Sequence, residues 1–137
     1  MSERPPTRSR VVIDTNVLVY ATFVDNEYHY EAYRMLQRRD VAIPYIVLYE
    51  YLWVLVRLTG DVDIVMTKLD ELSDFPLIHE DLKIMRRGIS MLKEDGAPLS
   101  LLNDYIILSI AMSEGALATY DKALRRLAAK RQVAVMP

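Results

Sequence analysis

The most constraining feature of the sequence is a short apolar run that ends in an acid. Val11–Ile13 are all β-branched, and Asp14 follows them directly, ahead of the helix-starting pair Thr15 and Asn16. Runs of this kind are typical of strands buried inside a parallel sheet. In open α/β sheets, ligands bind outside the carboxyl ends of the strands. The run therefore predicts a strand that delivers the Asp14 carboxylate to the functional edge of a sheet.

The rest of the chain alternates between predicted strands and helices. Strands are predicted at 11–13, 41–44, 75–79, 116–120 and 132–136. Helices are predicted at 16–23, 28–39, 45–58, 62–72, 80–93, 103–114 and 122–130. This alternation predicts an α/β fold in which helices sandwich a mainly parallel sheet of about five strands. Residues 1–9 contain two prolines and no periodicity, so we expect a flexible N-terminal arm followed by one domain over 10–137.

Composition narrows the class of protein. The 137 residues are 52% apolar, enough for one sizeable core, and contain no cysteine, which excludes disulfides, thiolate metal sites and a cysteine nucleophile. The net charge of −2 does not indicate a nucleic-acid binder, but an enzyme with acids at its site and a basic rim could have it. No apolar run approaches the ~20 residues of a membrane span, and the start lacks a signal segment, so we expect a cytoplasmic protein without membrane contact.

Three further acids occur in settings comparable to that of Asp14. Asp121 follows the strand predicted at 116–120, so its carboxylate is expected at the same sheet edge as that of Asp14. Glu50 and Asp104 each interrupt an apolar helix face near a predicted helix start, where an acid is uncommon unless something pairs with it. If these helices pack on the sheet, all four carboxylates can meet at one rim.

Each acid taken alone also has a structural interpretation. Asp14 and Asp121 are preferred helix N-cap residues, and Asp104 in a first turn complements the helix dipole. Glu50 could pair with Arg57 or with a more distant basic residue. The functional interpretation therefore depends on the four acids together.

Four carboxylates in a small space repel one another. A pair ~4 Å apart costs roughly 4 kcal/mol at an effective dielectric constant near 20, so protonation or a cation must relieve the repulsion. Oxygen-only ligation suits Mg²⁺ or Mn²⁺, and such ions assist phosphodiester hydrolysis by polarising a phosphoryl oxygen and activating water. The Asn16 amide and the Thr119 hydroxyl are expected to support the ligands, since each lies two residues from an acid.

Four segments carry a resemblance to a known family. They are Asp14–Leu18, Leu48–Leu52, Asn103–Ile107 and Thr119–Asp121. In order and spacing they resemble the PIN-domain family, above all its small VapC-type toxins, over about residues 10–135. The resemblance implies a three-layer α/β/α sandwich and a Mg²⁺- or Mn²⁺-dependent ribonuclease. It also implies a homodimer and a small antitoxin partner that blocks the site.

The resemblance assigns catalytic and metal-binding roles to an acidic quartet, Asp14, Glu50, Asp104 and Asp121. Asn16 and Thr119 match the family's supporting polar positions. Many members carry a second acid two residues after the last aspartate, where this chain has Ala123. The resemblance therefore supports one metal site better than two.

Other functions stay open at this point. One is a catalytically silent PIN-like binding module, and another is an RNA-processing factor without an antitoxin. A third is a phosphatase of the haloacid dehalogenase type, although that class needs an acid where this chain has Asn16. The last predicted helix is basic and could contact RNA, or it could be a solvated face. Tyr49, Tyr105 and Tyr120 adjoin the acids and could stack on bases or belong to the core.

Overall fold

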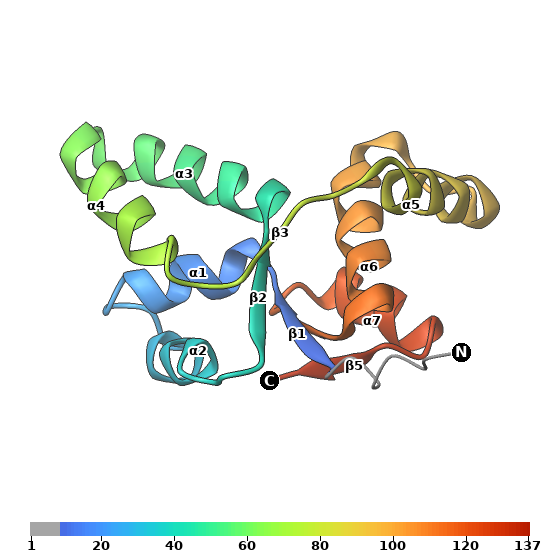
Figure 1. The fold of residues 1–137 in the computed structure, drawn as a ribbon, viewed down its shortest axis with the longest axis horizontal. Coiled ribbons are helices and arrows are strands. Elements are labelled where there is room, and N and C mark those ends of the chain that lie inside the picture. Colours follow the sequence, from blue (N-terminus) through green and yellow to red (C-terminus); the bar gives the residue numbers. More distant parts are fainter. Residues whose placement is uncertain (1–8) are drawn as a thin grey trace, which may run out of the picture.

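Five parallel strands form the sheet at the centre of the computed structural model, which describes residues 9–137 (Figure 1). The strands are β1 (Arg10–Ile13), β2 (Val41–Pro44), β3 (Leu77–Ile78), β4 (Gly115–Ala118) and β5 (Ala134–Met136). Their order in the sheet is β3-β2-β1-β4-β5, and every pair of neighbours is parallel. The predicted arm over 1–9 lies, apart from Ser9, outside the described residues.

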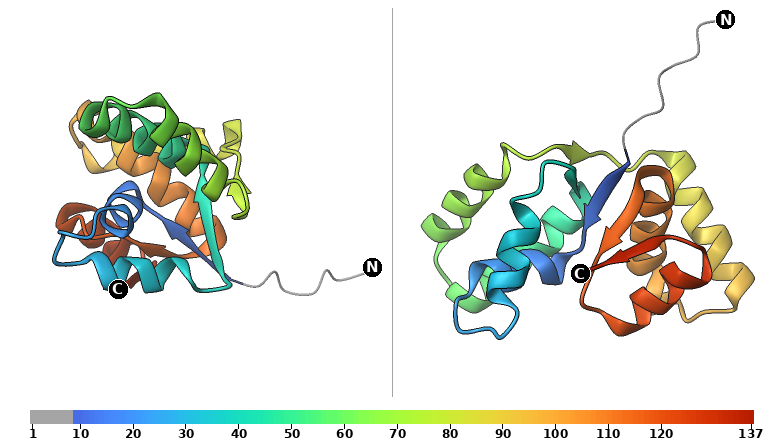
Figure 2. Two further views of the ribbon diagram at one scale, coloured as in Figure 1. Left: turned by 90° about the vertical axis from the view of Figure 1, so that its left-hand side faces the viewer. Right: turned by 90° about the horizontal axis from the view of Figure 1, so that it is seen from below.

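Helices connect the strands and cover the sheet. They are α1 (Thr15–Thr22), α2 (His29–Leu36), α3 (Tyr45–Thr59), α4 (Val62–Leu72), α5 (Leu82–Asp95), α6 (Leu102–Glu114) and α7 (Lys122–Lys130), with a short 3₁₀ turn at Leu99–Leu101. Figures 1 and 2 show α1–α4 gathered on one side of β1 and α5–α7 on the other. The predicted α/β sandwich with a mainly parallel sheet of about five strands is confirmed. Within residues 9–137, no helix is long and apolar enough to cross a membrane.

The core forms where the predicted apolar run packs against α6, the helix with the most buried residues. Val12 and Ile13 in β1 are completely buried, as are Leu108 and Ile110 in α6. Both faces of β1 are therefore covered, which explains its unbroken β-branched sequence. The buried stripe of α2 consists of His29, Ala32 and Met35. Tyr33, which the helical pattern places inward, is 51% exposed because it lies outside this stripe.

Helix α5 packs on α6 through a face that its apolar pattern indicates only in part. The spacing predicts a buried stripe of Leu82, Met85, Ile89 and Leu92; Leu92 is buried, but Leu82 and Ile89 are 72% and 52% exposed. The buried residues are Gly88, Met91 and Leu92. A Cβ atom on Gly88 would lie only 3.0 Å from the carbonyl oxygen of Tyr105, so the missing side chain lets the two helices approach closely.

The topology creates a switch point at the carboxyl ends of β1 and β4. The chain adds β2 and β3 on one side of β1 and then crosses over to add β4 and β5 on the other. The amide of Asp14 donates a 3.0 Å hydrogen bond to the carbonyl of Ala118, which joins the two strand ends. α3 begins at this edge directly after β2, and α6 begins there before it runs back to β4. Ligands of open α/β sheets bind at such switch points.

Candidate active site

A pocket of about 320 Å³ lies at the switch point and collects all four predicted acids. Asp14 follows β1, Asp121 lies three residues beyond β4, Glu50 is in the second turn of α3, and Asp104 is in the first turn of α6. The remaining lining residues are Thr15, Asn16, Val19, Tyr20 and Val54. Carboxylates from four separate elements thus share one pocket.

Asp14 is the most enclosed of the four acids. Its side chain is 7% exposed, and its Oδ1 accepts a 2.8 Å hydrogen bond from the amide of Thr15, so it caps α1. Its Oδ2 accepts bonds from the Thr119 hydroxyl at 2.6 Å and from the Asn16 amide at 3.3 Å. Burial raises the pKa of Asp14, the hydrogen bonds from Thr119 and Thr15 oppose that rise, and the charge of Asp121 adds to it.

Asn16 and Thr119 tie the two strand ends together beneath the pocket. The Asn16 side-chain nitrogen donates to the Thr119 hydroxyl at 3.2 Å, and its oxygen accepts the amide of Tyr120 at 3.0 Å. The Thr119 hydroxyl also accepts the amide of Asp121 at 3.1 Å while it donates to Asp14. All of the hydroxyl's hydrogen-bonding capacity is therefore used. The two predicted supporting residues lie within one network with Asp14.

Asp121 also caps a helix. Its Oδ1 accepts the amide of Leu124 at 3.0 Å, at the start of α7. The structural interpretation of Asp14 and Asp121 as N-caps is thus confirmed, and it does not compete with a functional one. Capping occupies the Oδ1 atom of each carboxylate, while Oδ2 of Asp14 accepts the bonds from Thr119 and Asn16.

Glu50 and Asp104 lack the helix-capping bonds of the other two acids. Glu50 Oε1 is buried and has no hydrogen-bond partner in the described part of the chain, and no ion pair between Glu50 and Arg57 occurs there. Burial raises the pKa of Glu50, as do the charges of Asp14 and Asp104, and the neighbouring Thr15 side chain opposes this rise. Burial and the charges of Asp121 and Asp14 raise the pKa of Asp104 to about 6. A buried carboxylate oxygen without a partner, close to other carboxylates, is unfavourable unless a cation binds beside it.

The acids share a pocket but do not form a preassembled ligand sphere. Over residues 9–137, no three acidic or histidine side chains are arranged closely enough to hold a metal ion directly. Mg²⁺ keeps several of its waters and is commonly bound through one or two carboxylates. The donor set, oxygen atoms only with an orphaned Glu50 Oε1, fits an ion of this kind.

Sequence reasoning missed part of the pocket lining. Thr15 was interpretable only as a helix cap, yet its hydroxyl is buried in the pocket and has no hydrogen-bond partner among the described residues. Val54 lies four residues after Glu50, and this spacing on one helix face could have identified it. Of the tyrosines that adjoin the acids, Tyr105 is 1% exposed and belongs to the core, whereas Tyr49 is 72% exposed.

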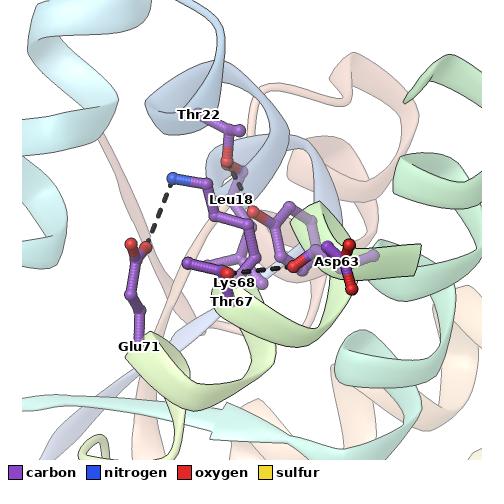
Figure 3. Close-up of polar contacts among 7 residues, drawn as sticks. Leu18, Thr22, Asp63, Thr67, Lys68 and Glu71 are labelled. Carbon is purple, nitrogen blue, oxygen red and sulfur yellow. Dashed lines mark hydrogen bonds and ion pairs between the residues drawn. The ribbon is translucent and has the colours of Figure 1, made fainter. Parts of the chain in front are cut away.

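A second cavity of about 210 Å³ lies between α1, α2, α3 and α4, and none of the four acids lines it. Polar side chains of α1, α3 and α4 make hydrogen bonds and an ion pair at this cavity, and Figure 3 shows these contacts. The Thr22 hydroxyl bonds to the carbonyl of Leu18 at 2.7 Å and to the hydroxyl of Tyr51 at 2.6 Å, and Lys68 pairs with Glu71 at 3.3 Å. The Thr22–Tyr51 contact joins α1 to α3, the other two contacts lie within single helices, and the cavity lining contains no cluster of acids.

Comparison with solved structures identifies similar folds. VapBC2 from Rickettsia felis, bound to a DNA fragment from its promoter, has a TM-score of 0.68 and 23% identity, covering 91% of this chain and 96% of that one. VapC20 from Mycobacterium tuberculosis, a toxin that cleaves the sarcin-ricin loop, has a TM-score of 0.69 and 16% identity, covering 85% and 94%. A toxin–antitoxin complex from Klebsiella pneumoniae has a TM-score of 0.64 and 24% identity, covering 81% and 86%.

Sequence comparison gives the family. No curated protein matches the chain. The family model of the PIN domain matches residues 11–130, which include all four acids and both supporting residues. Because this match spans most of the 137 residues, the chain belongs to the PIN domain family.

Proposed function

We propose that this protein is a Mg²⁺- or Mn²⁺-dependent endoribonuclease that hydrolyses RNA phosphodiester bonds. The observation that carries the proposal is the shared pocket of Asp14, Glu50, Asp104 and Asp121 at the switch point of the sheet. Three of these carboxylates have a pKa raised by burial and by the charge of another member. Membership of the PIN domain family supports nuclease chemistry over the phosphatase alternative.

The chain's own residues would perform two tasks in this reaction. Thr119, Asn16 and the amide of Thr15 fix both oxygens of Asp14, so this carboxylate is held in one orientation. Glu50 on α3 and Asp104 on α6 would complete the set of metal ligands. The buried Oε1 atom of Glu50 has no hydrogen-bond partner among the described residues, so it is available to bind an ion. When bound, the divalent ion supplies charge that neutralises the carboxylates and polarises the phosphodiester.

We further propose that the enzyme is the toxin of a toxin–antitoxin pair. Similarity in fold to VapBC2 and to the Klebsiella pneumoniae toxin–antitoxin complex supports a protein partner, and we propose that this partner blocks the acidic pocket. The neighbouring reading frame tests this directly. A short DNA-binding protein encoded immediately upstream, which copurifies with this chain and stops cleavage, is the expected finding. Absence of any such inhibitor would favour an RNA-processing factor without an antitoxin.

A homodimer is also part of the proposal. Tyr49, Trp53 and Val56 follow the helical spacing along α3 and are 72%, 63% and 43% exposed. A continuous apolar stripe of this kind on a helix surface is typical of an interaction site. Self-association would bury the stripe, and none of these three side chains belongs to the lining of the acidic pocket.

RNA cleavage under metal control tests the proposed enzyme. We expect the purified protein to cut RNA with Mn²⁺ or Mg²⁺, to stop on addition of EDTA, and to be inactive as Asp14→Asn. Asp74→Asn, which changes an exposed acid outside the pocket, is the matched control and should be fully active. Equal activity of Asp14→Asn and wild type would reject the mechanism. A folded wild type without RNA cleavage under any metal condition would favour the silent binding module.

A further inference from the structure

Three tyrosines from separate segments form a cluster at the edge of the acidic pocket. Tyr20 belongs to α1, Tyr28 precedes α2, and Tyr120 follows β4. The ring centroids of Tyr28 and Tyr120 lie 4.8 Å apart in a stacked arrangement. Tyr20 lies 5.1 Å from Tyr120 and 5.6 Å from Tyr28, in tilted arrangements. The three rings therefore contact one another as a unit, which we call the tyrosine cluster.

The cluster is joined to the candidate active site at two points. Tyr20 itself lines the pocket that holds the four acids. Tyr120 lies between Thr119 and Asp121, and its amide donates a 3.0 Å hydrogen bond to Asn16, which also bonds to Asp14. A group bound on the cluster would therefore lie beside whatever occupies the acidic pocket.

A hydrogen bond fixes the Tyr120 ring, another anchors the backbone of Tyr28, and Tyr28 stays partly exposed. The Tyr120 hydroxyl donates to Oε1 of Glu31 at 2.8 Å, and the amide of Tyr28 donates to the side chain of Asn26 at 2.8 Å. Tyr28 is 40% exposed even though it stacks on Tyr120. Fixed and partly exposed aromatic rings are the surfaces on which unpaired bases stack in single-stranded nucleic-acid binding proteins.

The charges around the cluster specify which part of a nucleotide could bind there. Glu27 adjoins Tyr28, and Glu31 contacts Tyr120. These carboxylates repel phosphate groups, but they accept hydrogen bonds from the amino groups at base edges. Cytosine carries such an amino group, whereas the corresponding position of uracil is a carbonyl oxygen, which a carboxylate repels.

We propose that the tyrosine cluster is a stacking platform for an unpaired base of the RNA substrate next to the cut bond, and that it favours amino-bearing bases over uracil. This inference rests on the proposed ribonuclease function, because it names the part of the substrate that lies beside the same pocket. Single-stranded RNA is read in this way generally, by stacking on aromatic side chains together with hydrogen bonds to base edges.

Binding of short fluorescein-labelled RNA by metal-free protein tests the platform without any catalytic step. We expect Tyr28→Ala to weaken binding of oligocytidylate about 5- to 150-fold, which is the range typical for loss of one stacked base. Tyr28→Phe keeps the ring and should bind as wild type. Tyr30→Ala removes a 75% exposed tyrosine two residues away, outside the cluster, and serves as the matched control. Equal binding by Tyr28→Ala and wild type would overturn the inference.

Two further readouts separate base stacking from phosphate binding and from cation binding. The salt dependence of binding should have the same slope in Tyr28→Ala and wild type, since no phosphate contact is lost; a flatter slope would contradict the platform.

Wild type should prefer oligocytidylate over oligouridylate. Glu31→Gln, whose side-chain oxygen still accepts a hydrogen bond from the Tyr120 hydroxyl, should reduce this preference. If Tyr28→Ala instead binds RNA normally and loses affinity for an oligoarginine peptide, the cluster takes cationic side chains and the inference is wrong.

Cleavage assays distinguish failure of the stacking-platform inference from failure of the proposed ribonuclease function. In cleavage assays with Mn²⁺, Tyr28→Ala should raise KM for single-stranded RNA and leave kcat within about twofold of wild type, because the lost contact is made equally in the ground and transition states. Cleavage by wild type with an unchanged KM in Tyr28→Ala would refute the platform alone. RNA binding that depends on Tyr28 without any cleavage would refute the enzyme alone.

Discussion

The Thr119 hydroxyl donates a 2.6 Å hydrogen bond to Oδ2 of Asp14, although the two residues lie 105 positions apart in the chain. The bond joins the carboxyl ends of β1 and β4, the two strands that flank the switch point. It is fully buried, and it fixes the carboxylate oxygen that does not cap α1. The orientation of Asp14 therefore depends on a residue that does not itself line the pocket.

Removal of this bond should reduce both stability and activity. Thr119→Val keeps the shape of the side chain but leaves the buried carboxylate without its shortest donor, at a cost of about 1–3 kcal/mol in the free energy of unfolding. Loss of a residue that orients a metal ligand typically lowers metal affinity or activity about 10- to 100-fold. Thr119→Ser restores the donor and should recover most of both. Chemical denaturation and Mn²⁺-dependent cleavage measure the two effects; a Val variant equal to wild type would contradict the role.

Asp104→Asn should stabilise the metal-free protein and at the same time inactivate it. Burial and the charges of Asp121 and Asp14 raise the pKa of Asp104 to about 6, so the ionised carboxylate at pH 7.5 opposes folding. After discounting for solvent screening, its removal should raise Tm in EDTA by about 3–6 °C, equivalent to about 1 kcal/mol. The variant should also lose the rise in Tm that Mn²⁺ gives wild type. A lower Tm in EDTA would show that Asp104 is not under repulsion.

Trp53→Lys should convert the proposed dimer to a monomer. Trp53 is 63% exposed at the centre of the apolar stripe on α3, and a lysine there would place a charge in the buried interface. Light scattering coupled to size-exclusion chromatography should give half the wild-type mass. Val24→Lys alters a 77% exposed apolar residue elsewhere and should leave the mass unchanged. If wild type is itself monomeric at all concentrations tested, the dimer is wrong.

Asp95 should make stability depend on pH in the acid range. Its carboxylate accepts the Tyr105 hydroxyl at 2.6 Å and a 3.0 Å bond from Arg131, which joins the end of α5 to the end of α7. The Tyr105 hydrogen bond, followed by the charges of Lys130 and Arg131, holds the pKa of Asp95 below its usual value.

A lowered pKa in the folded state stabilises the protein above the ordinary aspartate pKa, and the benefit is lost as pH falls through the folded value. Asp95→Asn should therefore lower Tm at pH 7, and its deficit should shrink as pH falls below about 4. Glu94→Gln, in which the adjacent and more exposed acid is neutralised, should have little effect. A constant deficit from pH 7 to pH 3 would assign the effect to packing and not to charge.

The parts of the fold that the sequence predicts are those in which local and tertiary preferences agree. The strand at Val41–Pro44 and the helices at Val62–Leu72 and Lys122–Lys130 have the predicted bounds. Proline ends the first, Asp61 caps the second, and Asp121 caps the third. Each of these signals is a single residue with a strong backbone preference. The tertiary contacts of the fold agree with that preference.

The face of α5 could not be predicted in the same way. An apolar pattern places Leu82 and Ile89 inward, but the close approach of α6 at Gly88 decides which face is buried. Contact through a missing side chain leaves no apolar signal in the sequence.

The tyrosine cluster could not be predicted for a similar reason, since Tyr20, Tyr28 and Tyr120 meet only after the switch-point topology brings three segments together.

Direct titration of Mn²⁺, followed by the electron paramagnetic resonance signal of the free ion, is the most direct test of whether the four carboxylates act together. We predict saturable binding to wild type and to Asp74→Asn, and affinity reduced at least about tenfold in each of four variants. These are Asp14→Asn, Glu50→Gln, Asp104→Asn and Asp121→Asn. Binding to all four variants with wild-type affinity, or no binding to wild type at millimolar Mn²⁺, would contradict a shared metal site.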